Sequence, residues 1–292
     1  MSEAHPITVA MILAAARQEL AAAGIADARG DARHLVAGIL GWSLGDLVLK
    51  DQEVLSPEAL ERIERALVRR HAREPVYRIL GSRNFYGLEL ALSTETLEPR
   101  PDTELVVDAL LPYLKRQAAE KGTVRVLDLG TGTGAIALAL LNECAEARAL
   151  ATDISEGALQ TARENARRNG LSDRFATCHS DWFDAIEGRF DMIVSNPPYI
   201  ERGMIGELEP EVRLHDPARA LDGGVDGLDC YRIIAAGAEA CLEPDGYVGL
   251  EIGFDQKQTV TDLFEDAGFK RIEALRDHAG QDRVLIFKTK QA

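Results

Sequence analysis

The feature that most constrains this chain is an alternation of short apolar runs with helix-length stretches that begins at Thr123. Such an alternation is typical of a parallel sheet covered by helices, because each parallel strand needs a long crossover connection. Strands are predicted over residues 124–129, 149–153, 175–180, 190–195 and 246–252, with helices over 134–141 and 158–169. Two last runs, 272–276 and 284–288, have no helix-length segment between them, so at least one must pair antiparallel. We therefore expect an α/β fold with a mostly parallel sheet.

The first 75 residues have a helical pattern instead, with apolar residues at every third or fourth position. Thr8 and Ser56 are suited to cap two of these helices. Helices are predicted over residues 8–24, 31–40, 43–49 and 56–72. Pro75 is expected to end this part, and residues 85–97 have the pattern of a β-hairpin. The predicted parts are a small helical-bundle domain (1–75), a linker with the hairpin (76–99) and the α/β domain (100–292).

A basic cluster closes the last long helix of the N-terminal part. Positive charge there suits the negative end of the helix dipole, which favours a structural role. A patch that docks a substrate is the alternative interpretation. The cluster consists of Arg69, Arg70, His71 and Arg73.

The overall charge bears on the class of partner. Lys and Arg total 33 against 48 for Asp and Glu, which gives a formal net charge of −15. Proteins that grip nucleic acid usually carry a basic surface, so this balance argues against direct nucleic-acid binding. The chain has no apolar run of membrane-spanning length and no secretory leader pattern, and its cysteines and histidines lack metal-ligand spacing. We expect a cytoplasmic protein without a membrane segment, disulfide or metal site.

A glycine-rich loop joins the first predicted strand to its helix. Residues 128–134 have the sequence DLGTGTG, whose G-x-G-x-G spacing differs from those of dinucleotide-binding and phosphate-binding loops. Glycines there let the backbone approach a ligand without Cβ collisions. Asp153 ends the next strand, where an acid can accept hydrogen bonds from both ribose hydroxyls; its alternative role is to cap the following helix. The loop residues predicted to contact a cofactor are Gly130, Thr131, Gly132, Thr133 and Gly134.

An aromatic residue follows the third strand. Trp182 stands between Asp181 and Phe183, and an acid beside aromatic rings suits the edge and face of an adenine. The alternative is that Trp182 belongs to the core. Because open α/β sheets bind ligands at the carboxyl ends of their strands, these positions together predict one nucleotide-type cofactor site.

The tetrad Asn196-Pro197-Pro198-Tyr199 follows strand 190–195 and is expected at the same edge. An amide or aromatic amino nitrogen is a poor nucleophile, because its lone pair is delocalised into the neighbouring π system. The Asn196 side-chain oxygen and the Pro197 carbonyl can accept its two N–H groups and aim the lone pair at an electrophilic methyl. The prolines fix φ and remove two backbone donors, while Tyr199 can cover the planar group. We expect all four residues to bind the substrate, Asn196 also to contact the cofactor, and catalysis by positioning through Asn196, Pro197 and Tyr199.

Two alternatives remain open for the tetrad itself. The first is a rigid loop with no chemical role. The second concerns the substrate, since the exocyclic amine of a base and a side-chain carboxamide both present a planar NH₂. The tetrad alone does not choose between them.

The chain resembles the HemK/PrmC family, the peptide chain release factor glutamine N5-methyltransferases, over nearly its whole length. DNA adenine methyltransferases share only the tetrad and the glycine loop, so further matching segments favour the glutamine substrate. Those segments are residues 75–81 (PVYRILG), 85–88 (FYGL), 100–104 (RPDTE), 220–228 (ALDGGVDGL) and 251–253 (EIG).

The resemblance implies a Rossmann-like class I methyltransferase domain, with a mostly parallel seven-stranded sheet and an antiparallel terminal strand. It implies S-adenosylmethionine as the cofactor and S-adenosylhomocysteine as the product. The implied substrate is the glutamine in the Gly-Gly-Gln loop of class I release factors, a role in translation termination. The N-terminal helical domain would then contact the release factor outside the catalytic pocket.

Two residues depart from the family pattern. Glu98 stands where an apolar residue is usual, and Asp216 stands where a glutamate is usual. The shorter side chain of Asp216 puts any contact through that carboxylate in doubt. Neither departure touches the tetrad.

Two other functions compete with protein-glutamine methylation. A nucleic-acid amine methyltransferase shares the tetrad, but the acidic charge and the hairpin segment argue against it. A non-catalytic cofactor-binding adaptor would need only the glycine loop, so intact Asn196 and Tyr199 argue against that reading.

Overall fold

The computed structural model describes residues 6–290 of the chain. The chain divides into two compact units. One consists of Met1–Gly81 together with Pro210–His215, and the other of Ser82–Glu209 together with Asp216–Ala292. The described part of the first unit is helical, and the second contains both sheets.

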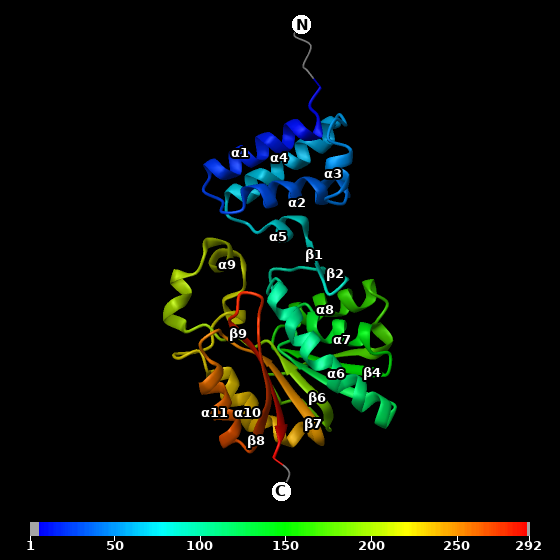
Figure 1. Cartoon of the computed structure of the whole chain (residues 1–292), viewed down its shortest axis with the longest axis vertical. Coiled ribbons are helices and arrows are strands. Elements are labelled where there is room, and N and C mark those ends of the chain that lie inside the picture. The colour runs from blue at the N-terminus through cyan, green and yellow to red at the C-terminus, as the bar shows by residue number, and fades with distance from the viewer. Residues whose placement is uncertain (1–5, 291–292) are drawn as a thin grey trace. The chain divides into compact units, whose positions relative to one another are not determined.

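The first unit is a helical bundle whose apolar stripes meet in one core. Thr8 accepts a hydrogen bond from the backbone N–H of Met11, and Ser56 accepts one from that of Ala59, so both predicted caps are confirmed. The prediction that Pro75 ends the helical part is wrong, because Pro75 is the cap residue of a further short helix. The helices are α1 (Val9–Ala22), α2 (Ala28–Leu40), α3 (Asp46–Leu49), α4 (Pro57–His71) and α5 (Val76–Leu80) (Figure 1).

A short helix from far along the chain, α9 (Pro210–His215), completes this unit. The Glu211 carboxylate lies 3.0 Å from Arg70 and 3.3 Å from Arg73, and Arg70 also donates to Asp31 at 2.7 Å. Two arginines of the predicted basic cluster are therefore held by carboxylates of their own unit. These contacts favour the structural interpretation of the cluster over a docking patch.

The second unit is built on a seven-stranded sheet with the order β5-β4-β3-β6-β7-β9-β8. The first five strands in this order pair in parallel, and β9 lies antiparallel to both β7 and β8. The predicted α/β class, the mostly parallel sheet and the terminal hairpin are confirmed. The strands are β3 (Val124–Leu129), β4 (Ala147–Asp153), β5 (Phe175–His179), β6 (Phe190–Ser195), β7 (Leu242–Glu251), β8 (Phe269–Arg276) and β9 (Asp282–Thr289).

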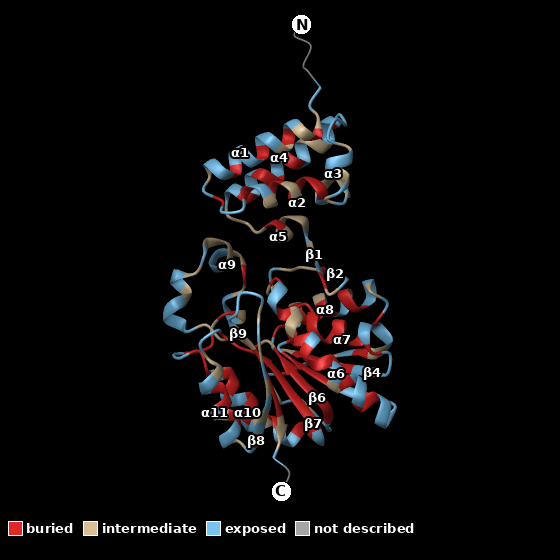
Figure 2. Ribbon diagram, viewed as in Figure 1, coloured by how far each residue is buried: buried red, intermediate tan, exposed pale blue. Residues whose placement is uncertain are grey.

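Helices cover both faces of this sheet (Figure 1). In β3, Val124 and Val126 pack into one apolar core, while Leu127 and Leu129 pack into another. Figure 2 shows the central strands buried along most of their length. The first core also contains residues of α6 (Glu104–Lys121), α7 (Ala135–Glu143) and α8 (Glu156–Arg168), and the second contains residues of α10 (Asp229–Cys241) and α11 (Lys257–Asp266).

A two-stranded hairpin, β1 (Ser82–Phe85) and β2 (Leu88–Ala91), begins the second unit. The predicted hairpin is confirmed, but its bounds are wrong, because it spans residues 82–91 and not 85–97. Tyr86 and Gly87 both have positive φ, 50° and 78°, as the central residues of a type I′ hairpin turn require. The chain consequently turns there and leaves β2 at Ala91.

Replacing Gly87 with alanine is expected to destabilise the second unit by about 1 kcal/mol, because an L side chain is strained at positive φ. Urea unfolding, followed by Trp182 fluorescence in a Trp42→Phe background, measures the loss. Gly203→Ala is the matched control, since an added Cβ there meets open space and the φ is not positive. Equal unfolding midpoints for Gly87→Ala and the control would contradict the assignment of the turn.

Candidate active site

Strand pairing brings three chain segments together at the carboxyl edge of the sheet. Leu129, the last residue of β3, pairs with Thr152 of β4 on one side and with Ser195 of β6 on the other. The Ser195 hydroxyl also donates to the Leu129 carbonyl at 2.7 Å, which ties the ends of the two strands together. The residues that follow on the three strands are Gly130, Asp153 and Asn196.

The glycine loop leaves β3 in a conformation that favours glycine at three positions. Gly130, Gly132 and Gly134 have φ of 67°, 55° and 83°. A Cβ built on Gly130 or Gly132 would meet no protein atom within 4 Å, so the space beside this backbone is open. The loop therefore leaves room for a ligand to come close to its main chain.

Asp153 holds this loop in place. Its Oδ2 accepts a hydrogen bond from the Gly132 N–H and its Oδ1 from the Ser155 N–H, both at 2.9 Å. The cap of α8 is Ser155, whose hydroxyl accepts from the Ala158 N–H, so the capping alternative for Asp153 is contradicted. Burial raises the pKa of the Asp153 carboxyl above its ordinary value.

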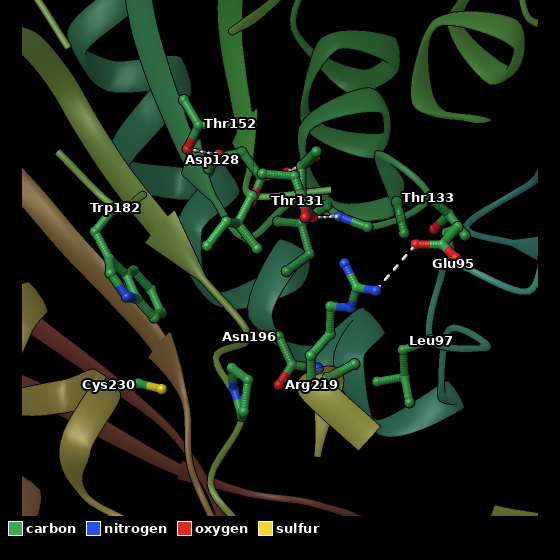
Figure 3. A pocket seen from close by; sticks show the side chains of 18 of the residues that line it. Glu95, Leu97, Asp128, Thr131, Thr133, Thr152, Trp182, Asn196, Arg219 and Cys230 are labelled. Carbon is green, nitrogen blue, oxygen red and sulfur yellow. Dashed lines mark hydrogen bonds and ion pairs between the residues drawn. The ribbon is translucent and has the colours of Figure 1, made fainter. Parts of the chain in front are cut away.

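A cavity of about 330 Å³ opens beside the loop, and its size suits a small organic ligand (Figure 3). Figure 3 shows Trp182 and Asn196 at the same cavity, and they come from the segments that follow β5 and β6. Trp182 also packs against the second core, and its contact with an adenine stays a prediction. The predicted site residues that line the cavity are Gly130, Thr131, Gly132, Thr133, Asp153, Trp182, Asn196 and Pro198. Those outside the lining are Gly134, Pro197 and Tyr199.

One acidic residue of the cavity was not predicted as a site residue. Asp128 is buried just before the loop, and its Oδ2 accepts a hydrogen bond from the Thr131 hydroxyl at 2.7 Å. Its Oδ1 is buried without a hydrogen-bond partner among the described residues. Burial raises the pKa of Asp128 to about 6. An acid near the end of a mostly apolar strand was the sequence signal that could have identified it.

An ion pair at the cavity was also not predicted. Arg219 lies 3.4 Å from Glu95 (Figure 3). Ser155 donates to the same carboxylate at 2.9 Å. Both charged residues belong to the lining. They come from segments more than a hundred residues apart, and neither lies in a pattern that marks a ligand site, so the sequence carried no signal for them.

The tetrad is held by side chains from other elements. The Asn196 amide nitrogen donates to the Thr103 hydroxyl at 3.2 Å. The Tyr199 hydroxyl donates to Glu251 at 3.3 Å, and the Tyr199 carbonyl accepts from Gln256 at 3.0 Å. Burial raises the pKa of Tyr199 well above its ordinary value, so the phenol stays neutral.

The segment 220–228 packs tightly against the end of the tetrad. Ile200 donates its N–H to the Leu221 carbonyl at 3.0 Å, and Gly223 donates its N–H to the Ile200 carbonyl at 2.8 Å. A Cβ on Gly223 would lie 2.8 Å from the Cα of Tyr199, so only glycine fits there. This segment therefore supports the backbone that carries the Tyr199 ring.

Both departures from the family pattern have partners in the structure. Glu98 is buried and forms an ion pair with Arg83 of the hairpin. Asp216 is buried and lies 3.3 Å from Arg100, so the shorter carboxylate still reaches a cation. The carboxylate of Asp216 thus has a cationic partner within its own unit.

Comparison with known proteins agrees with this geometry. Residues 105–209 match the model of the methyltransferase small domain, and residues 11–81 match that of the PrmC N-terminal domain. The release factor glutamine methyltransferase of Agrobacterium fabrum is 54% identical over 288 residues, which cover 99% of this chain and 100% of that protein. That of Rhodospirillum rubrum is 44% identical over 291 residues, 100% of this chain and 88% of that protein. The chain belongs to the release factor glutamine methyltransferase family.

Solved structures support the fold. The catalytic domain of hMettl16 has a TM-score of 0.55 at 14% identity, over 81% of this chain and 83% of that one. A methyltransferase from Pyrococcus furiosus has a TM-score of 0.53 at 21% identity, over 75% of this chain and 97% of that one. The predicted class I methyltransferase fold and the family are confirmed, and the family is S-adenosylmethionine-dependent.

The cavity has features that fit S-adenosylmethionine. The open space beside Gly130 and Gly132 admits a ligand, and Asp153 places a carboxylate at the end of β4. Asp128, a buried acid, also belongs to the lining of this cavity.

Two further observations concern other ligands and membranes. Within residues 6–290, no helix is long and apolar enough to cross a bilayer. The same residues contain no group of three or more His, Cys, Asp or Glu side chains placed to hold a metal ion.

Asp153→Ala is expected to weaken S-adenosylhomocysteine binding by about 10- to 100-fold, because charged hydrogen bonds contribute about 1.5–3 kcal/mol each. Isothermal titration calorimetry measures the affinity directly. Asp173→Ala, which removes an exposed acid near the start of β5, is the control and keeps the original affinity. Unchanged binding by Asp153→Ala would remove Asp153 from the cofactor site.

Proposed function

We propose that this enzyme transfers the methyl group of S-adenosylmethionine to the side-chain amide nitrogen (N5) of the glutamine in the Gly-Gly-Gln motif of class I release factors. The observation that carries the proposal is the pairing of Leu129 with Ser195, which sets the tetrad directly beside the glycine loop. The family of the chain supports the substrate, since its relatives are release factor glutamine methyltransferases. We assign this reaction to the cytoplasm, with the helical unit as a second contact for the release factor.

Asn196 and Pro197 bind the reacting amide. The Asn196 Nδ2 is engaged by Thr103, so Oδ1 is the atom left to accept an N–H of the substrate. The Pro197 carbonyl accepts the second N–H, and the two acceptors together fix the plane of the amide. The lone pair of the nitrogen then points along one direction. S-adenosylmethionine, when bound, would supply the electrophilic methyl group.

Pro198 and Tyr199 complete the substrate pocket. The two prolines of the tetrad have fixed φ and no N–H, so this segment offers acceptors and little freedom to rearrange. The Tyr199 ring covers the planar amide. The residue is held by hydrogen bonds at its side-chain hydroxyl and at its backbone carbonyl. Positioning of this kind contributes roughly 7–11 kcal/mol to lowering a barrier in favourable systems.

Incubation with S-adenosylmethionine is expected to add one methyl group to a class I release factor, on the glutamine of its Gly-Gly-Gln motif. Peptide mass spectrometry locates the methyl group. A release factor with Gln→Ala in that motif is the control and stays unmodified. Equal labelling of this variant, or preferential labelling of RNA or DNA, would overturn the glutamine assignment.

Asn196→Ala is expected to lower kcat by about 10²- to 10³-fold, as loss of one preorganised polar contact to the reacting group does in other enzymes. Its affinity for S-adenosylhomocysteine falls less than that of Asp153→Ala, which calorimetry checks. The opposite pattern, a cofactor-binding defect with kcat retained, would contradict the division of roles between Asn196 and Asp153.

A further inference from the structure

A buried carboxylate lies behind the tetrad, and its part in the mechanism above is limited to accepting a hydrogen bond from the Tyr199 hydroxyl. Glu251 ends β7 and is 2% exposed, yet it does not line the cofactor cavity. Its Oε1 accepts the hydrogen bond from the Tyr199 hydroxyl. Its Oε2 is buried without a hydrogen-bond partner among the described residues. A buried carboxylate with a free oxygen is costly to keep ionised, so its presence calls for a function.

Thr103 connects this carboxylate to Asn196. It is 3% exposed, lines the cavity and stands at the N-cap position of α6, but its hydroxyl makes no capping bond to that helix. The hydroxyl instead accepts from the Asn196 amide at 3.2 Å, and it stabilises the ionised form of Glu251. Thr103 therefore faces the tetrad on one side and the carboxylate on the other.

The hydrogen-bond donors along this chain of residues have a fixed order. Because a carboxylate can only accept, a hydrogen bond between Thr103 and ionised Glu251 uses the single hydrogen of the Thr103 hydroxyl. The Thr103 oxygen can then only accept, and the group of Asn196 that faces it must be the NH₂. The amide oxygen of Asn196 is consequently turned away from Thr103 and is available to the substrate.

We propose that Glu251 and Thr103 are positioning residues for methyl transfer: ionised Glu251, through Thr103, fixes which end of the Asn196 amide faces the substrate, and it anchors Tyr199 directly. The inference rests on the proposed roles of Asn196 and Tyr199 in binding the glutamine amide. Protonated Glu251 would carry a hydrogen of its own and would no longer require the Thr103 hydroxyl to donate. The orientation of Asn196 would then be lost.

The surroundings of Glu251 place its ionisation near neutral pH. Burial raises the pKa of Glu251 to about 7, and Asp102 adds to the rise, whereas Thr103, Arg283 and Tyr199 oppose it. Tyr231 of α10 also faces it and donates to its backbone carbonyl at 3.0 Å. Because the ionised form is the active one, kcat is expected to rise with pH through about 7 and then level off.

The first experiment compares Thr103→Val with Thr103→Ser at saturating S-adenosylmethionine and release factor. Valine has the shape of threonine without the hydroxyl, so kcat should fall by about 10- to 100-fold, as small misplacements of reacting groups do. Serine restores the hydroxyl and should recover most of that loss. Thr261→Val, the same change at another buried threonine, in α11, controls for the loss of a buried hydroxyl as such.

The second experiment measures kcat from pH 6 to 9 for Glu251→Gln and the unaltered enzyme. The variant cannot ionise, so the rise through about pH 7 should disappear, while S-adenosylhomocysteine affinity is unchanged. Both enzymes are measured at saturating cofactor. A change in cofactor affinity on titration of Asp128, which lines the cofactor cavity, then does not limit the rate. Thermal unfolding reports whether the variant is folded. If it is not folded, the comparison of Thr103→Val with Thr103→Ser tests the inference instead.

Three outcomes would overturn the inference. The first is a kcat for Thr103→Val close to that of the unaltered enzyme, and the second is no recovery by Thr103→Ser. The third is a pH rise that persists in folded Glu251→Gln. Absence of methyl transfer by the unaltered enzyme would instead overturn the proposed function on which the inference rests.

Discussion

The site depends on one constraint, the register in which β3 pairs with its two neighbours. Leu129 stands opposite Thr152 and Ser195, so the chain leaves three adjacent parallel strands at the same level. The glycine loop, the Asp153 carboxylate and the tetrad therefore lie together at the carboxyl edge of the sheet. A slip of one residue in β6 would turn Asn196 to the other face of the sheet, because side chains alternate along a strand. Both apolar cores oppose such a slip. Each core contains residues of β3 and β6, and a slip would take buried side chains of β6 out of the core that holds them.

Much of this arrangement could be predicted from the sequence, because its determinants are local. The apolar runs of the parallel strands and the glycines at 130–134 each follow from a short pattern. The rule that ligands bind at the carboxyl ends of parallel strands then places Asp153 and Asn196 together. Such short patterns predict neither the order of the strands in the sheet nor the class of substrate. The substrate followed only from the family resemblance.

What the sequence could not predict depends on contacts between distant segments. The hairpin turn required positive φ at a tyrosine, Tyr86, which sequence patterns do not favour. The assignment of α9 to the helical unit depends on Glu211 meeting arginines that lie far earlier in the chain. Thr103 and Glu251 stand 148 residues apart, and only the fold brings both of them to the tetrad. Such residues position others without forming a motif, so they become visible only when the neighbours of each buried polar atom are known.

The central claim is that the tetrad binds an amide nitrogen through two oxygen acceptors beside the cofactor. A crystal structure of the enzyme with S-adenosylhomocysteine and a Gly-Gly-Gln peptide tests this most directly. The account predicts the glutamine amide nitrogen within about 2.7–3.2 Å of both the Asn196 Oδ1 and the Pro197 carbonyl oxygen, under the Tyr199 ring. A glutamine bound away from these oxygens, or an Asn196 whose nitrogen faces the amide nitrogen, would contradict it.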